Sequence, residues 1–93
     1  MSRRVDPNSK AYRLVEAFLE DQGQIPPCTS SQREAAVTAL CTLADQMWLG
    51  QPPNDAVGVA ETTYRAQTGA NAPPWLEWLL AAFCMSIEQQ PAP

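Results

Sequence analysis

The chain has 93 residues, of which 45% are hydrophobic and 17% charged, and its net charge at pH 7 is −4. This length supports one hydrophobic core and no second domain, and the composition is typical of folded proteins rather than disordered ones. Four of the six cations, Arg3, Arg4, Lys10 and Arg13, precede residue 14, so the rest of the chain carries nine carboxylates against two arginines. Such an acidic body repels phosphate backbones, which disfavours nonspecific binding of nucleic acids.

The cysteines and the lack of histidine restrict the chemistry that the chain can offer. Cys28, Cys41 and Cys84 are widely spaced, without a C-x-x-C pair, which is typical of reduced thiols in the cytosol. We expect Cys41 and Cys84 to be small core residues. Three scattered sulfurs lack the spacing of a zinc site, and no glycine-rich loop with the lysine of a phosphate site is present, so neither a metal nor a cofactor is predicted.

Hydropathy places the chain outside the membrane and outside secretion. No apolar segment reaches the ~20 residues that cross a bilayer. The first four residues lead into polar sequence rather than into the apolar run of a secretory signal. A cytoplasmic protein is therefore expected.

The first helix is predicted over about residues 7–22, after residues 1–5, which we expect to be flexible. Asp6 and Pro7 supply an N-cap and a proline at the first helical position, and Gly23 supplies a C-terminal stop. Apolar residues between them recur at the spacing of one helical face. They are Ala11, Leu14, Val15, Phe18 and Leu19.

The second helix is predicted over about residues 31–49, after a tandem proline that forces an extended connection. Ser31 and Glu34 have the spacing of a capping box, and Thr29 and Gln32 offer an overlapping alternative. Four alanines give this segment high helix propensity and a slim surface. A slim helix allows its neighbours to approach closely.

The third helix is predicted over residues 55–68, with Asn54 or Asp55 as its N-cap. Gly58 and three threonines lower its helix propensity, which leaves a short strand over residues 60–64 as the alternative. We find no second strand with which such a strand could pair. The glycines predicted to end the second and third helices are Gly50 and Gly69.

The fourth helix, about residues 73–90, is the most apolar stretch, and we expect the other three to pack around it. Only Glu77, Ser86 and Glu88 give it a polar strip, so most of its circumference needs covering. Residues 91–93 form a tail expected to be flexible. Together these segments predict an all-α fold, a compact bundle of four helices joined by loops containing proline or glycine, in a single domain over residues 1–93.

Three tryptophans provide the main functional signal. Trp48, Trp75 and Trp78 either share one core or leave an indole partly exposed as a docking anchor, since tryptophan is enriched in interface hot spots. The last helix has more apolar circumference than a four-helix packing needs, and methionine supplies adaptable surface. The residues predicted to bind a partner are Trp75, Trp78, Met85, Trp48 and Glu77.

Catalytic groups are sparse. Without histidine, the chain lacks the side chain most often used for proton transfer near neutral pH. Glu16 and Glu20 share one face of the first helix, but nothing apolar surrounds them there, so we interpret them as a solvated surface. Cys28 precedes the start of the second helix, where the helix dipole lowers a thiol pKa, and a thiol-dependent activity is the alternative it offers.

A small DNA-binding transcriptional regulator is another alternative. The second and third helices could form a helix-turn-helix, and Thr62, Thr63, Arg65 and Gln67 carry groups that read bases. A specific interface needs several basic contacts to phosphates, however, and the body of the chain supplies only two arginines. Nucleic acid is therefore not the expected partner.

In size, acidity and architecture the chain resembles small helical proteins that act by occupying a partner. These are secretion chaperones, toxin-neutralising immunity proteins, and host-factor inhibitors carried by phages and mobile elements. The resemblance includes no motif and therefore implies no residue roles. It favours a non-enzymatic protein-binding module, monomeric or homodimeric, that docks an unidentified protein through an apolar, tryptophan-containing patch of the last helix.

Overall fold

The computed structural model describes residues 10–21 and 25–89, and this part of the chain contains four helices and no strand. The helices are α1 (Lys10–Asp21), α2 (Ser30–Trp48), α3 (Pro53–Thr68) and α4 (Pro74–Glu88). The predicted all-α bundle of four helices is confirmed. The start predicted at residues 6 and 7, the stop predicted at residue 23 and the tail lie outside the described residues.

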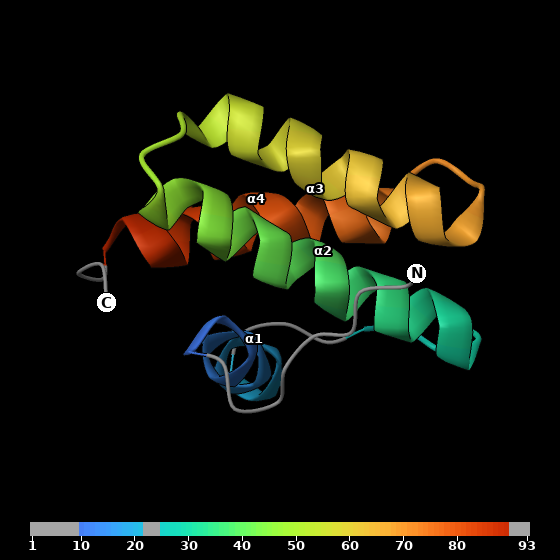
Figure 1. Ribbon diagram of the computed structural model, residues 1–93. Coiled ribbons are helices and arrows are strands. Elements are labelled where there is room, and N and C mark those ends of the chain that lie inside the picture. Colours follow the sequence, from blue (N-terminus) through green and yellow to red (C-terminus); the bar gives the residue numbers. More distant parts are fainter. Residues whose placement is uncertain (1–9, 22–24, 90–93) are drawn as a thin grey trace.

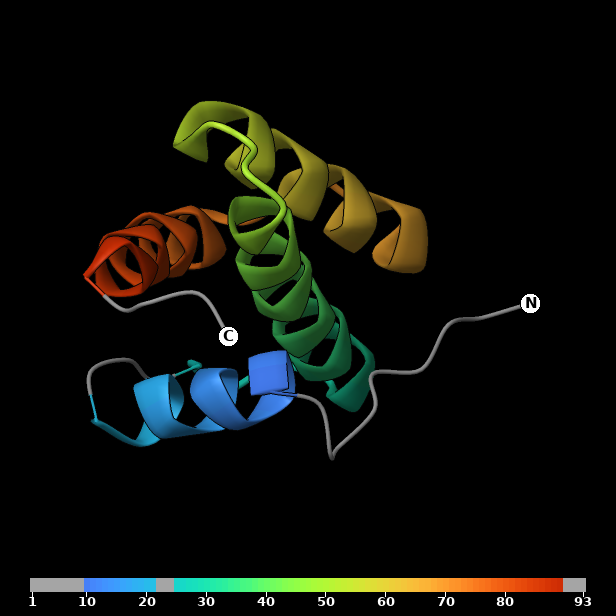
Figure 2. The ribbon, with the colours of Figure 1, turned by 60° about the vertical axis from the view of Figure 1, so that its left-hand side comes forward.

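Helix α2 lies at the centre of the bundle, and α1, α3 and α4 all pack against it (Figures 1 and 2). This differs from the expectation that α4 would be the central helix. The small side chains of α2 explain the difference, because they allow three neighbours to approach one helix. Four of its alanines are completely buried: Ala35, Ala36, Ala39 and Ala44.

Helix α1 crosses α2 and also reaches α4. Ala11, Val15 and Phe18 are buried, as the helical spacing predicted. The rings of Phe18 and Phe83 have centroids 4.9 Å apart and are inclined by 52°, a favourable tilted arrangement of aromatic pairs. This contact joins the first and last helices across the core.

A capping box starts α2, and it is the one formed by Thr29 and Gln32. The Gln32 amide donates to Thr29 Oγ1 at 3.1 Å, and the Thr29 amide donates to Gln32 Oε1 at 3.0 Å. The prediction that favoured Ser31 and Glu34 was wrong, because the helix begins at Ser30, one residue earlier than predicted. Thr29 therefore stands at the N-cap, and Ser31 is already inside the first turn.

Helix α3 starts without a side-chain cap. Pro52 is its N-cap and Pro53 occupies the first helical position, so the caps predicted at Asn54 and Asp55 were wrong. Proline has no amide hydrogen to leave unpaired at this position, and its fixed φ suits the helix. The end at Gly69 is as predicted, with φ of 74° in the left-handed region.

The threonines of α3 do not break the helix, and the alternative strand over residues 60–64 was wrong. Each hydroxyl donates to the carbonyl four residues earlier, Thr62 to Gly58 at 2.9 Å and Thr63 to Val59 at 3.0 Å. The hydroxyls thus find their acceptors within the helix and not in an alternative, non-helical conformation. Tyr64, between these groups and the end of the helix, is buried in the core.

Candidate functional site

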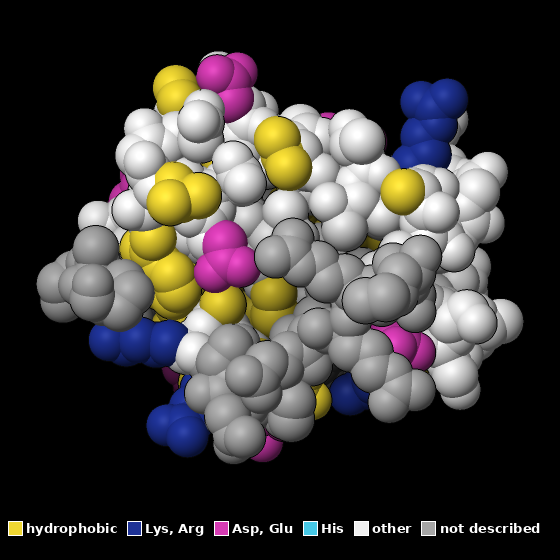
Figure 3. All heavy atoms as spheres, in the orientation of Figure 1, with side chains coloured by type: hydrophobic (Ala, Val, Ile, Leu, Met, Phe, Trp, Pro, Cys, Tyr) yellow, Lys and Arg dark blue, Asp and Glu magenta, His cyan; other side chains and the backbone are white. Residues whose placement is uncertain are grey.

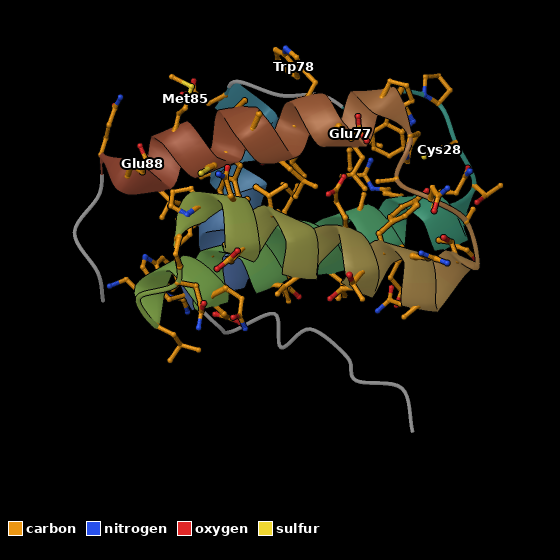
Figure 4. All side chains as sticks on the ribbon, turned by 90° about the horizontal axis from the view of Figure 1, so that it is seen from above. Cys28, Glu77, Trp78, Met85 and Glu88 are labelled. Carbon is orange, nitrogen blue, oxygen red and sulfur yellow. The ribbon has the colours of Figure 1, made fainter. Side chains whose placement is uncertain are left out.

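The outer face of α4 carries the two most exposed large side chains of this helix. Trp78 is 62% exposed and Met85 is 64% exposed. They stand seven residues apart, two helical turns, and both point away from the other helices on one side of α4 (Figure 4). Ala81 lies exposed between them. We call these three residues the Trp78–Met85 face.

The opposite side of α4 explains why this face is directed outward. The helix has more apolar side chains than one packed side can hold, and branched and aromatic residues fill the side that contacts α1, α2 and α3. Trp78 and Met85 lie about half a turn away from that side. The residues of the buried side are Leu76, Leu79, Leu80, Phe83 and Ile87.

Carboxylates border the Trp78–Met85 face along one edge. Glu77 and Glu88 are exposed and lie about a quarter turn around α4 from the row formed by Trp78 and Met85. Neither Lys nor Arg occurs in α4. Glu77 also lines a hollow with two residues of α3, the negatively charged Glu61 and the positively charged Arg65.

The other two tryptophans are half-buried and pack against the core. Trp75 lies one turn before Trp78, and Trp48 ends α2. The indole nitrogen of Trp48 is buried and has no hydrogen-bond partner within the described part of the chain. The predicted binding set therefore divides into Trp78, Met85 and Glu77, which are exposed, and Trp75 and Trp48, which are anchored in the bundle.

Sequence reasoning missed two residues of this surface, Ala81 and Glu88. Both can be found from the sequence once the outward direction of Trp78 is known. Ala81 is three residues from Trp78, and Glu88 is three residues from Met85, so both fall on adjoining rows of the helix surface. The spacing of these residues along the helix can be read from the sequence, but the side of the helix that faces solvent cannot.

The outer side of α3 is a contrasting surface. Over this helix, the upper part of Figure 3, hydrophobic side chains form separate spots among polar atoms. Val59 is the most exposed large apolar residue of α3, at 40%. Of the four residues of the DNA-binding alternative, Thr62, Arg65 and Gln67 are exposed here and Thr63 is half-buried. The helix carries no cation besides Arg65. The phosphate contacts that this alternative needs are not supplied by the helix itself.

The three cysteines occupy different environments. Cys28 is exposed ahead of the Thr29 N-cap, whereas Cys41 and Cys84 are buried, as predicted for core residues. Burial raises the pKa of Cys41 to about 12, with contributions from Asp45 and Glu16, and burial with Glu88 raises the pKa of Cys84. Because Cys28 is exposed and the other two thiols are buried, an alkylating reagent should modify Cys28 first whether or not it is catalytic.

A groove of about 340 Å³ lies between α1 and α2. Its floor includes Val15, Leu19 and Val37, and Glu16 and Glu20 stand at its edge. Both glutamates are exposed, which fits a solvated surface. The described residues that line the groove include no serine, threonine, cysteine or lysine.

The described residues hold neither a metal-binding cluster nor a membrane-spanning helix. No group of three or more histidine, cysteine, aspartate or glutamate side chains there is arranged to hold a metal ion. None of the four helices combines the length and apolarity required to span a membrane. Comparison of the chain with protein-family models, curated proteins and solved structures finds no match.

Proposed function

We propose that this protein is a non-enzymatic protein-binding module that docks a partner protein through the Trp78–Met85 face. One observation carries the proposal: two large apolar side chains, 62% and 64% exposed, lie on the same outer side of a helix whose other side forms the core. Contiguous exposed apolar surface on a small protein marks an interaction site. An adaptor, a chaperone or an inhibitor of the partner would all use such a face.

The residue types suit an interface anchor. Tryptophan supplies a large contact area with few rotatable bonds, and removal of a tryptophan hot spot commonly costs 2 kcal/mol or more of binding free energy. Methionine adapts its shape to the partner. Trp75, three residues earlier on α4, packs against the core.

Composition supports the remaining parts of the proposal. The chain has no histidine for proton transfer, which favours a binding role over catalysis. The three cysteines are free, which favours a reducing compartment such as the cytoplasm. Small size and acidity favour a protein that occupies a partner surface, such as an inhibitor of a host factor carried by a phage or mobile element.

The test is capture of a partner with matched surface variants. We expect the full chain, immobilised and exposed to lysate of its source organism, to retain a specific protein, and Trp78→Ala to lose it. Leu49→Ala is the control, because Leu49 is 76% exposed at the end of α2 and lies off the Trp78–Met85 face. Retention of the same protein by Trp78→Ala, or its equal loss with Leu49→Ala, would contradict the proposal.

A further inference from the structure

Resting on the proposed function, we infer that the Trp78–Met85 face binds a basic helical segment of another protein and not a second copy of this chain. The inference concerns the chemistry of the occupant. It follows from the charge along the edge of the face, from the area that the face offers, and from its shape.

The charge along the face is of one sign. Glu77 and Glu88 lie along the same edge, eleven residues or about 16 Å apart, and α4 carries no cation. The adjoining hollow is lined by Glu61, Arg65 and Glu77, one cation against two carboxylates, and Glu88 lies outside it, so the charge along this edge stays negative. A partner that covers the indole partly desolvates these carboxylates, so cations opposite them are required for a favourable interface.

The area of the face shows how far an occupant must extend. The exposed parts of Trp78 and Met85 together offer on the order of 300 Å². A stable interface buries about 800 Å² on each partner. An occupant must therefore also cover surface around these two side chains, including the edge that carries Glu77 and Glu88.

Charge argues against a second copy. If two α4 helices packed antiparallel, with Trp78 of one against Met85 of the other, Glu77 would approach Glu88 of the second copy. If they packed parallel, the two-fold axis would place the carboxylates of the two copies on opposite edges of the contact. The antiparallel arrangement brings like charges together, and neither arrangement places a cation of α4 opposite the carboxylates, so self-association lacks the charge complementarity of a favourable interface.

The shape of the face favours a helix as the occupant. Two large side chains stand two turns apart, and the small Ala81 lies between them. This leaves a space into which an apolar side chain of a crossing helix can insert. The expected partner segment is an amphipathic helix whose apolar stripe meets Trp78 and Met85 and whose Lys or Arg residues lie along one edge, about three turns apart.

Two synthetic peptides of about 20 residues, long enough for useful helicity, provide the probe. Both carry leucine at the positions of one helical stripe. One has lysine along the edge of the stripe, and the other has glutamate at the same positions. Binding of each labelled peptide to the full chain is measured by fluorescence anisotropy at low and high salt. Light scattering of the chain alone reports its oligomeric state.

We expect the lysine peptide to bind at least about tenfold more tightly than the glutamate peptide, and its affinity to fall as salt is raised. Glu77→Gln with Glu88→Gln should weaken the lysine peptide roughly 2- to 30-fold. Glu77→Lys with Glu88→Lys should reverse the preference between the peptides. Glu34→Gln, at an exposed site on α2, is the control and should change nothing.

The outcomes separate the inference from the function on which it rests. Equal binding of both peptides, lost on Trp78→Ala, would overturn the basic-partner inference and leave the binding function standing. A dimer that Trp78→Ala dissociates would identify a second copy as the occupant and overturn the inference. If neither peptide bound, the inference would also be overturned. The capture experiment with Trp78→Ala would then test the proposed function independently.

Discussion

Helices α2 and α4 differ in composition and in position. Helix α2 is rich in alanine and contacts all three other helices, and Leu49, the most exposed large hydrophobic residue of the described chain, lies just beyond its end. Helix α4 is rich in large apolar residues, yet its outer side carries Trp78 and Met85 in contact with solvent. The side chains of α2 are small enough to allow neighbouring helices on several sides. Helix α4 packs on one side only, and its apolar side chains on the other side, Trp78 and Met85, remain exposed.

The comparison shows that the central helix of a small bundle need not be its most hydrophobic one. Burial depends on how many neighbours can approach, and close approach depends on small side chains. Surplus hydrophobicity on a peripheral helix is then available for another molecule. The fold and the candidate binding face are thus two consequences of the same difference between α2 and α4.

The largest expected effect comes from removing a side chain at the centre of α2. Leu40 is completely buried, and Leu40→Ala should lower the free energy of unfolding by about 2–5 kcal/mol through lost burial and a cavity. Met85→Ala removes a side chain of similar size from the outer side of α4 and should change it by less than about 0.5 kcal/mol. Urea unfolding measures both, and equal losses would contradict the assignment of centre and surface.

Enlarging an alanine tests whether α2 is central because it is slim. Ala39 is completely buried, so Ala39→Leu should destabilise the protein by about 1–3 kcal/mol through overpacking. Ala81→Leu, on the exposed side of α4, meets solvent and should leave stability within about 0.5 kcal/mol. Thermal melts followed by circular dichroism compare the pair, and tolerance of Ala39→Leu would show that close approach is not what places α2 at the centre.

The buried thiol of α2 predicts a loss of stability in alkali. The pKa of Cys41 is raised from 9.0 to about 12 in the folded protein, so the folded state holds this proton more tightly than the unfolded chain. The stabilisation is fully present below pH 9 and is lost as pH rises toward 12. By pH 10 the loss is about 1.4 kcal/mol.

Denaturant unfolding of Cys41→Ala between pH 7 and pH 10 measures how much of the stability lost in alkali is due to Cys41. The variant should lose less stability over the interval than the parent protein, whatever its stability at pH 7. Cys84→Ala should act in the same direction, because burial and Glu88 raise the pKa of that thiol as well. If Cys41→Ala and the parent lost stability in parallel, the thiol of α2 would not be the group that titrates.

Local signals allowed the helices to be predicted from the sequence. Prolines and glycines act on the backbone of their immediate neighbours, so the predicted second helix, residues 31–49, differs from α2 by one residue at each end. The third helix starts two residues earlier than predicted because Pro53 occupies its first position. The fourth, predicted over residues 73–90, has its described helical part at Pro74–Glu88.

Tertiary arrangement could not be predicted in the same way. Apolar content indicates how much surface a helix must bury, but not which neighbours bury it, so α4 was wrongly expected at the centre. The same limit applies to the site. Trp75 and Trp78 are three residues apart on a helix that is apolar on nearly all sides, and no pattern in the sequence distinguishes the half-buried indole from the exposed one.

The start of α2 provides the smallest effect and separates the cap that the sequence favoured, at Ser31, from the one that the structure shows, at Thr29. Thr29 and Gln32 exchange hydrogen bonds there, so Thr29→Ala should lower the free energy of unfolding by about 1 kcal/mol. Ser31 is exposed inside the first turn, and Ser31→Ala should be neutral or slightly stabilising, because alanine has the higher helix propensity. Helix α4 starts at Pro74 with no side-chain cap, so its start should depend on no comparable hydroxyl. Chemical denaturation of the two variants measures the difference, and a larger loss for Ser31→Ala would place the cap two residues later and shorten the central helix.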